Sequence, residues 1–227
     1  MLSYGEGSLA LVDRALADGV GHAVLVMRHS AREFVPGRHD LINPLTDEGR
    51  DAARRLGERL PKSLTVRGYA SPPERCVETA ALILDGHRSG GGSATRHRPL
   101  EALGVFYALD QMRMWKGMDA AGGLVPYVSS WVQGRVPADA MMPAETAARL
   151  LLAVLAGKLR QPLAERQLDL CVTHDMTLYM LREVLLGEPA DGPPVNFLDA
   201  LLLFERDGAL WMCSHHGEPR RLADAGS

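Results

Sequence analysis

The sequence predicts an α/β protein whose mostly parallel central sheet is flanked by helices in three layers. Short apolar runs of strand length alternate along the chain with segments of helical periodicity, which is the order of a parallel sheet with helical connections. Three of the apolar runs end abruptly in charged or polar residues, and in such sheets ligands bind at the carboxyl ends of strands. The length of 227 residues fits a single domain, within which we expect residues 105–142 to form a small helical lid.

The composition excludes several classes of protein. A formal net charge of −3 argues against a strongly basic nucleic-acid binder, and no apolar stretch reaches the length of a membrane span. The three cysteines form no CxxC pair, so reduced thiols fit better than a disulfide framework or a zinc site. No signal peptide is apparent at the N-terminus. We therefore expect a cytoplasmic protein without a membrane partner, and the composition leaves its oligomeric state open.

Lysine is rare in the sequence. Only three of the 25 basic residues are lysines, at positions 62, 116 and 158, and the others are arginines. A surface bias explains most of this excess. The alternative is that some of the arginines bind anions, because the guanidinium fork matches phosphate oxygens. Only the positions of individual arginines can separate these two explanations.

The first part of the chain predicts a helix, a strand and a second helix. Residues 8–17 carry apolar side chains at helical spacing, with Ser8 as the capping residue. The continuous apolar run 22–27 is typical of a strand buried on both faces. After a polar loop, Thr46 caps a helix that extends to about residue 60, with two acidic residues in its positive first turn.

The middle of the chain predicts a second strand, a third helix and then a change of character. The strand covers residues 64–70, and the helix runs from 71 to about 84 with prolines near its first position. The glycine-rich stretch 85–94 predicts a flexible linker, followed by a short strand near 95–98. Residues 105–142 hold five of the ten methionines and five aromatic residues, which can grip an apolar part of a substrate or form a local core.

The last third of the chain returns to alternating helices and strands. A helix covers residues 143–159 and begins at a proline, and a buried strand follows at 168–173. The next helix, 174–186, begins directly at the end of that strand. Residues 197–204 and 209–214 predict a final strand pair.

Charged and polar side chains follow three of the predicted strands: Arg28, His29 and Arg32 after the first, Ser71 and Arg75 after the second, and His174 and Asp175 after the strand at 168–173. Each group alone has an ordinary explanation, such as a hydrogen-bonded loop histidine or an acidic residue in the first turn of a helix. A parallel sheet, however, gathers these strand ends at one edge. Together they predict a binding site for a dianionic phosphate group.

A histidine in such a site can do more than bind. Neutral imidazole can attack phosphorus, which divides one difficult displacement into two easier steps. Positioned arginines stabilise the charge on the phosphoryl oxygens in the transition state. A carboxylic acid must protonate the leaving oxygen and later take a proton from the attacking water. Because arginines can supply the positive charge, we expect neither a metal ion nor another cofactor.

Four segments resemble, in order along the chain, the motifs of the histidine phosphatase superfamily, which has the phosphoglycerate mutase-like fold: residues 24–32 (VLVMRHSAR), 43–49 (NPLTDEG), 69–80 (YASPPERCVETA) and 172–175 (VTHD). The resemblance implies a metal-independent phosphatase that hydrolyses a phosphate monoester of a small molecule. It implies that His29 is the nucleophile that becomes phosphorylated.

The resemblance also implies the groups that bind the phosphoryl oxygens. Arg28, Arg75 and His174 match the phosphate-binding positions of the superfamily. Arg32 stands where the acid phosphatase branch has an additional phosphate-binding arginine. Ser30 replaces the usual glycine, and its hydroxyl can bond either the loop or the phosphate.

The proton donor has two candidates. Asp175 follows the second site histidine, as the donor does in the acid phosphatase branch, whereas Glu101 corresponds to the glutamate of the phosphoglycerate mutase branch. We favour Asp175 because it is adjacent to His174. A surface carboxylate in a loop is the ordinary explanation for Glu101.

The sequence is also compatible with other functions and sites. The same residues can serve a phosphomutase, or a non-catalytic module that binds a phosphorylated ligand. Arg113 and Lys116 can contact a second anionic group or lie on a solvated helix face. The adjacent His215 and His216 lack a third ligand at a spacing useful for a metal ion.

Overall fold

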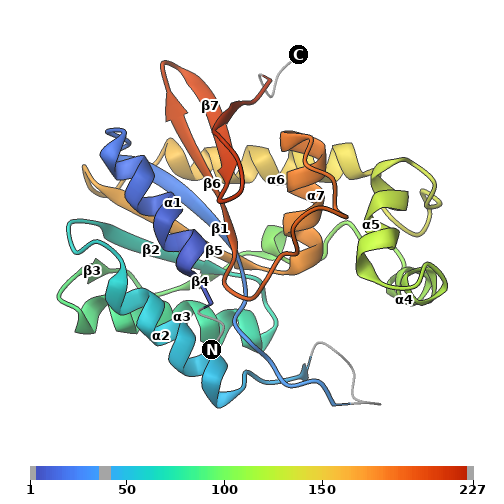
Figure 1. Cartoon of the computed structure of the whole chain (residues 1–227), viewed down its shortest axis with the longest axis horizontal. Helices are drawn as coiled ribbons and strands as arrows, with labels where there is room; N and C mark the ends of the chain where they lie inside the picture. The colour runs from blue at the N-terminus through green and yellow to red at the C-terminus, as the bar shows by residue number, and fades with distance from the viewer. Residues whose placement is uncertain (1–3, 36–41, 224–227) are drawn as a thin grey trace.

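The apolar runs of the sequence form one eight-stranded sheet in the computed structural model, which describes residues 4–35 and 42–223 (Figure 1). The strands follow the order β3-β2-β5-β1-β6-β7-β8, and β4 also pairs with β2. Their bounds are β1 His22–Arg28, β2 Thr65–Ala70, β3 Ser93–Ala94, β4 Arg98–Pro99, β5 Gln167–Thr173, β6 Ala200–Arg206, β7 Ala209–Ser214 and β8 Arg220–Arg221. The middle of the polar loop predicted after the first strand, residues 36–41, lies outside the described part.

Strands β2, β5 and β1 run parallel, and their register brings their carboxyl ends side by side. Arg28 pairs with Thr173 across β1 and β5, and Ala70 pairs with Val172 across β2 and β5. On the other side of β1 the sheet continues antiparallel through β6, β7 and β8. The residues that follow β1, β2 and β5 therefore meet at one edge of the sheet.

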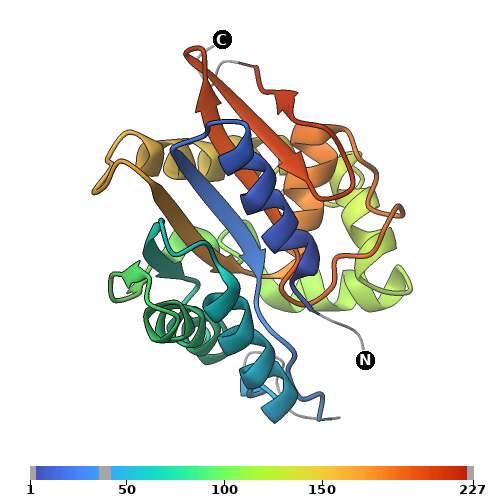
Figure 2. The same cartoon turned by 60° about the vertical axis from the view of Figure 1, so that its left-hand side comes forward.

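Helices cover both faces of the sheet. Their bounds are α1 Glu6–Ala17, α2 Asp47–Arg59, α3 Glu74–Ser89, α4 Gln111–Ala120, α5 Leu124–Val132, α6 Ala144–Leu159 and α7 Asp175–Leu186. Side chains alternate along β1, so that Leu25 and Met27 join a core with α1, α2 and α3, while Val24 and Val26 join a core with α4 to α7. Figure 2 shows α1 lying across the first of these faces. The predicted three-layer α/β architecture is confirmed.

The predicted start of the first helix is wrong, whereas that of the second is confirmed. The helix begins after Gly5, which adopts the left-handed conformation at a φ of 88°. Ser8 lies inside the helix, where its hydroxyl donates to the Leu198 carbonyl (2.5 Å) instead of capping. Thr46 caps α2 as expected, because its Oγ1 accepts from the Gly49 N–H (3.0 Å).

The predicted flexible linker at 85–94 is also wrong. Helix α3 continues to Ser89, and β3 pairs with β2 directly after the turn that follows. A Cβ at Gly86 would collide with the Arg54 carbonyl of α2, and one at Gly57 with the Ile83 carbonyl of α3. These glycines allow α2 and α3 to approach closely, so part of the glycine-rich composition serves helix packing. The short strand expected near 95–98 is found as two short strands, β3 just before this range and β4 beginning at Arg98.

Residues 105–142 contain the expected short helices, α4 and α5, preceded by the 3-10 helix η2 (Glu101–Leu103). Some of the aromatic and methionine side chains form a local core, where five are almost fully buried: Tyr107, Met114, Tyr127, Trp131 and Met141. Others are half-buried and face a cavity described below. Movement of this segment as a lid stays a prediction. No helix in the described part of the chain combines the length and apolarity needed to cross a membrane.

Candidate active site

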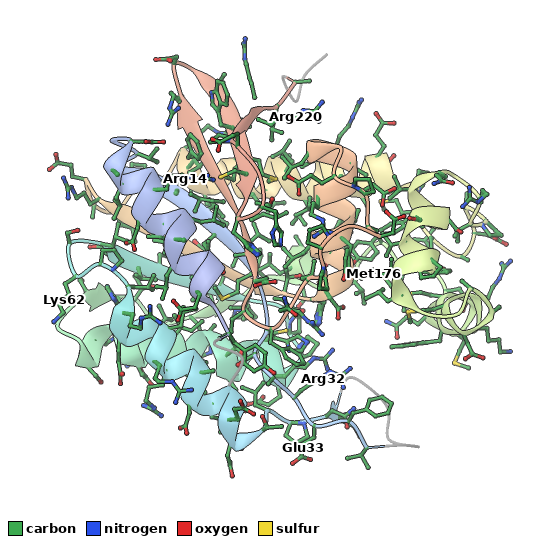
Figure 3. The ribbon with its side chains drawn as sticks, in the orientation of Figure 1. Arg14, Arg32, Glu33, Lys62, Met176 and Arg220 are labelled. Atoms are coloured by element: carbon green, nitrogen blue, oxygen red, sulfur yellow. The ribbon has the colours of Figure 1, made fainter. Side chains whose placement is uncertain are left out.

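Backbone hydrogen bonds hold the segments that carry the expected site residues at the carboxyl edge of the sheet. The His29 N–H donates to the Thr173 carbonyl and the Ser71 N–H to the Val172 carbonyl, both at 2.9 Å. Figure 3 shows Arg32 on the loop after β1 and Met176 on α7 beyond the end of β5. The sheet register thus determines where these side chains meet.

His29 is held as a neutral imidazole. Its side chain is 2% exposed, and its Nδ1 lies 2.8 Å from the Ser30 carbonyl, which can only accept, so Nδ1 carries the proton. Nε2 accepts from the Arg75 Nε–H at 3.1 Å. Burial, and then the charge of Arg75, hold the pKa of His29 well below its usual value of 6.5. At neutral pH the Nε2 of His29 therefore carries no proton, as a nucleophilic nitrogen requires.

Arg75 connects the two site histidines. It is 3% exposed, and besides His29 it contacts the Nδ1 of His174 through Nη2 at 3.3 Å. Because a guanidinium only donates, this Nδ1 accepts, and the Nε2–H of His174 donates to the Ser71 hydroxyl at 2.9 Å. Burial, followed by the charge of Arg75, lowers the pKa of His174 to about 4. Both rings are neutral, and their centroids are 5.7 Å apart.

Arg28 contacts both Asp175 and Phe197, a residue that the sequence did not identify as part of the site. Its Nη2 is 2.8 Å from the Asp175 Oδ2, and its Nη1 donates to the Val195 carbonyl at 2.7 Å. The guanidinium lies 4.1 Å from the ring centroid of Phe197, which is also 5.9 Å from the His29 ring. Phe197 thus covers both Arg28 and His29. Nothing in a single sequence connects a loop phenylalanine to a motif almost 170 positions earlier.

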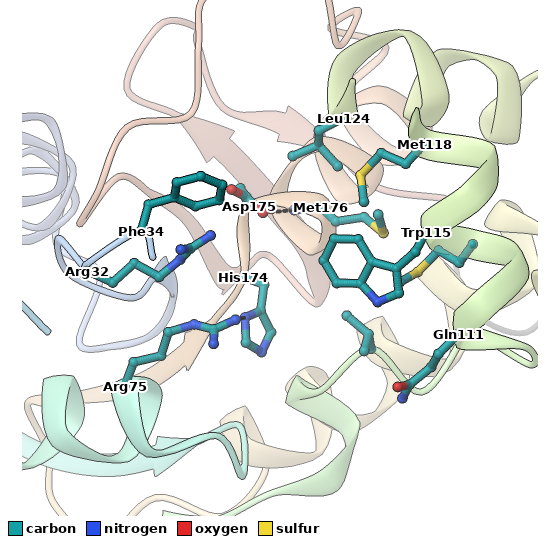
Figure 4. Close-up of a pocket in the computed structure, with 12 residues that line it drawn as sticks. Arg32, Phe34, Arg75, Gln111, Trp115, Met118, Leu124, His174, Asp175 and Met176 are labelled. Carbon is teal, nitrogen blue, oxygen red and sulfur yellow. Dashed lines mark hydrogen bonds between the residues drawn. The ribbon is translucent and has the colours of Figure 1, made fainter. Parts of the chain in front are cut away.

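A cavity of about 270 Å³ lies beside these groups, but neither Arg28 nor His29 is among the residues that line it (Figure 4). Arg32, Arg75, His174 and Asp175 contribute its charged and polar surface. Most of the remaining wall is apolar, and its residues are Phe34, Val105, Gln111, Met114, Trp115, Met118, Leu124 and Met176. The buried Nε2 of His29 faces Arg75, which belongs to the wall. The arrangement offers a phosphate group several donors and a neutral imidazole.

Ser30 takes the first of the two roles expected for it. Its hydroxyl is fully buried and donates to the Gly49 carbonyl at 2.7 Å, at the start of α2. Its N–H donates to the Thr79 hydroxyl at 3.1 Å. The expectation that the Ser30 hydroxyl binds phosphate is therefore corrected, because this hydroxyl already joins the loop after β1 to α2.

Three other expected residues lie away from the cavity wall. Glu101 is exposed on η2 and does not line the cavity, whereas its competitor Asp175 does. Arg113 is exposed and forms an ion pair with Asp139 at 2.5 Å, and Lys116 is exposed on the same helix. The geometry therefore favours Asp175 as the carboxyl group of the site and gives Arg113 and Lys116 no contact there.

Metal-ligating side chains do not cluster in the described part of the protein. Within residues 4–35 and 42–223, no three His, Cys, Asp or Glu side chains gather closely enough to hold a metal ion. His215 and His216 lie against each other, with ring centroids 3.7 Å apart, but without a third ligand. The three cysteines are buried free thiols.

The lowered histidine pKa values predict that acid destabilises the protein. Below pH 6.5, His29 and His174 bind protons in the unfolded state but stay neutral in the folded state, where both are buried. The free energy of unfolding therefore falls as the pH drops from 6.5 towards the folded-state pKa, which is about 4 for His174. Each such group contributes a loss of about 1.4 kcal/mol per pH unit in this window. Denaturant titrations between pH 7 and 4 measure the slope, which we expect to be shallower in His174→Gln. Equal slopes in the variant and the wild type would contradict the neutral, buried state of His174.

Comparisons with known proteins agree with the motifs. Residues 22–104 match the model of the histidine phosphatase superfamily (branch 1). This match includes three of the four motif segments, and the segment at 172–175 lies beyond it. No curated protein matches the sequence of the chain.

Solved structures of low sequence identity share the fold. YhfR of Bacillus stearothermophilus is 20% identical, with a TM-score of 0.56 over 85% of this chain and 96% of that chain. A phosphoglycerate mutase from Bacillus anthracis is 16% identical, with a TM-score of 0.55 over 85% and 91%. A phosphoserine phosphatase mutant from Entamoeba histolytica, in complex with phosphoserine, is 16% identical, with a TM-score of 0.55 over 85% and 95%. The predicted phosphoglycerate mutase-like fold and the resemblance to the superfamily are confirmed.

Proposed function

We propose, from the match of residues 22–104 to the histidine phosphatase superfamily, that this protein is a phosphatase that hydrolyses phosphate monoesters through a phosphohistidine at His29. One observation supports this proposal most strongly. His29 is neutral and buried, its proton is fixed on Nδ1 by the Ser30 carbonyl, and its Nε2 faces a guanidinium at the edge of a cavity. An imidazole held in this way has the correct tautomer for attack by Nε2 on phosphorus.

In the first step the phosphoryl dianion takes up the donors of the site. Its oxygens bind Arg28, Arg32, Arg75 and His174, and Arg75 turns its Nε–H from His29 to the phosphate. Nε2 of His29 then forms a bond to phosphorus while the bond from phosphorus to the ester oxygen breaks. Asp175 donates its proton to the leaving alcohol.

In the second step water hydrolyses the phosphohistidine. The Asp175 carboxylate takes a proton from the water, whose oxygen bonds to phosphorus as the bond from phosphorus to Nε2 breaks. Inorganic phosphate leaves, His29 returns to its neutral form, and Asp175 is protonated again. The arginines supply the positive charge throughout, so the reaction needs no metal ion.

The substrate is a small phosphorylated molecule whose alcohol portion has apolar character, because apolar side chains form most of the wall beyond the charged end. The compartment is the cytoplasm, where the three buried thiols stay reduced.

The basic test is the release of inorganic phosphate from p-nitrophenyl phosphate by the purified protein. We expect turnover that EDTA does not diminish. Activity that a chelator removes and a divalent metal restores would contradict a site in which arginines supply the positive charge.

Two alternatives give different results in related assays. A phosphomutase would return the phosphoryl group to an alcohol, so its product is an isomeric phosphate ester and not inorganic phosphate. A module that only binds would bind a phosphate ester tightly and would carry no label on His29 after exposure to a labelled substrate.

The role of Asp175 depends on the leaving group. The p-nitrophenolate ion leaves without a proton, whereas an alkoxide needs one. Asp175→Asn is therefore expected to slow the hydrolysis of an alkyl phosphate about 10²–10⁴-fold and that of p-nitrophenyl phosphate far less. Glu101→Gln is the matched variant and should change neither rate, because Glu101 does not line the cavity. Steady-state kinetics with both esters measure this difference. A selective loss in Glu101→Gln would assign the donor to Glu101 instead.

A further inference from the structure

The cavity has two chemically different ends. At one end Arg32, Arg75 and His174 converge with Asp175, and this is the end that receives the phosphate. At the other end the side chains of Trp115 and Met118 from α4 and Leu124 from α5 form the wall, as Figure 4 shows. Val105, Met114 and Met176 extend this apolar surface, and Phe34 lies on the side of Arg32.

The apolar end contains no group that can pair with a second charge. Gln111 is the single polar residue among the described ones that line this end. The nearby cations are engaged or directed elsewhere: Arg113 pairs with Asp139, and Lys116 is exposed outside the wall. Arg32 belongs to the phosphate end, since its charge is among those that lower the pKa of His174. A carboxylate placed beside Trp115 and Leu124 would lose its hydration without gaining a partner.

The size of the cavity limits the length of the alcohol. A volume of about 270 Å³ lies just below the usual range of roughly 300–1,000 Å³ for ligand sites, which suits a phosphate with one ring or a short chain. Trp115 offers a flat surface to such a group, and the flexible methionines adapt to its shape.

We propose, as a deepening of the proposed function, that the substrates are monoesters of small apolar alcohols that carry no charge besides the phosphate, and that Trp115, Met118 and Leu124 select them. Phosphoserine, bound in one of the structurally similar proteins, carries a carboxylate and an ammonium group next to its ester oxygen. Such a substrate places charge against the apolar wall here. We therefore expect this chain to discriminate against it.

Binding of non-hydrolysable phosphonates tests the proposal independently of catalysis. Calorimetry compares methyl-, butyl- and hexylphosphonate with 2-amino-4-phosphonobutanoate, the phosphonate analogue of phosphoserine. Each buried methylene is expected to raise the affinity about three- to fourfold, so hexylphosphonate should bind at least about 30-fold more tightly than the aminocarboxylate. Equal affinities, tighter binding of the aminocarboxylate or no binding of any phosphonate would overturn the proposal.

Variants at the apolar end show whether these side chains cause the preference. Trp115→Ala should weaken hexylphosphonate about tenfold or more and leave methylphosphonate unchanged, because methylphosphonate does not reach the indole. Met112→Ala is the matched control, since Met112 lies on the same helix but is 65% exposed and outside the wall. Leu124→Arg should strengthen binding of the aminocarboxylate by supplying the missing cation. An equal loss of methyl- and hexylphosphonate binding in Trp115→Ala would contradict the assignment.

Turnover of the matching esters separates this proposal from the general one. Preferential binding of hexylphosphonate without hydrolysis of hexyl phosphate would contradict the proposed phosphatase activity and support the proposed preference for apolar ligands. Faster hydrolysis of phosphoserine than of hexyl phosphate would contradict the proposed preference for apolar substrates and support the proposed phosphatase activity.

Discussion

Replacing His29 with alanine or glutamine is expected to abolish phosphatase activity, with a loss of roughly 10⁴–10⁶-fold in kcat, the size seen when a covalent nucleophile is removed. His174, the other histidine of the described site, is not placed to replace it. The His174 ring is 5.7 Å away, and both of its nitrogens are engaged by Arg75 and Ser71. Steady-state hydrolysis of p-nitrophenyl phosphate measures the loss.

The controls for this prediction address the burial of His29. His87 is also a buried histidine, and it lies on α3, away from the cavity. Its Nε2 is hydrogen-bonded to the Leu64 carbonyl at 3.0 Å. His87→Gln is expected to keep the activity of whatever fraction folds. His29→Gln should still bind inorganic phosphate, because the arginines remain. Substantial turnover by a folded His29→Gln protein would refute the role of His29 as nucleophile.

Replacing Arg75 with lysine is expected to reduce kcat/KM about 10²–10³-fold, which is the range found when one donor to a developing negative charge is lost. Replacing Arg75 with alanine is expected to reduce kcat/KM further. The guanidinium reaches both site histidines, at 3.1 Å and 3.3 Å. A lysine ammonium is a compact charge and cannot span the two positions. The same charge also helps to keep both histidines neutral, so its removal should raise the pKa of His29.

Two measurements separate this effect from a general change of charge. Arg149 is an exposed arginine of α6 that pairs with Glu145 at 2.8 Å, so Arg149→Ala changes the net charge equally and should leave the kinetics intact. Titration of the His29 ring by NMR should show a higher pKa in Arg75→Ala than in the wild type. A kcat/KM of Arg75→Lys within threefold of the wild type would contradict the bridging role.

Strands and helix starts with local signals could be predicted from the sequence. The run 22–27 is apolar at every position but the first, which identifies a strand buried on both faces, and β1 covers it. Thr46 combines a capping side chain with acidic residues behind it, and α2 begins there. The register between β1, β2 and β5 was not available from the sequence, but the parallel order alone sufficed to bring their carboxyl ends together.

The errors arose where a distant contact overrides a local signal. Ser8 has the side chain of a cap, but the carbonyl of Leu198, 190 positions later, takes its hydrogen bond. Gly86 suggests a linker, yet it allows α2 and α3 to touch. The Ser30 hydroxyl bonds to Gly49 for a similar reason. Phe197 is the clearest case, because its contact with Arg28 depends wholly on the loop before β6.

Detection of the covalent intermediate tests the central claim most directly. The protein is mixed with ³²P-labelled hexyl phosphate, quenched in alkali within milliseconds, and digested for mass spectrometry, because phosphohistidine survives base and decays in acid. We expect label on His29 in the wild type and none in His29→Gln. Hydrolysis of the ester with no label on His29 at any quench time would contradict a phosphohistidine mechanism.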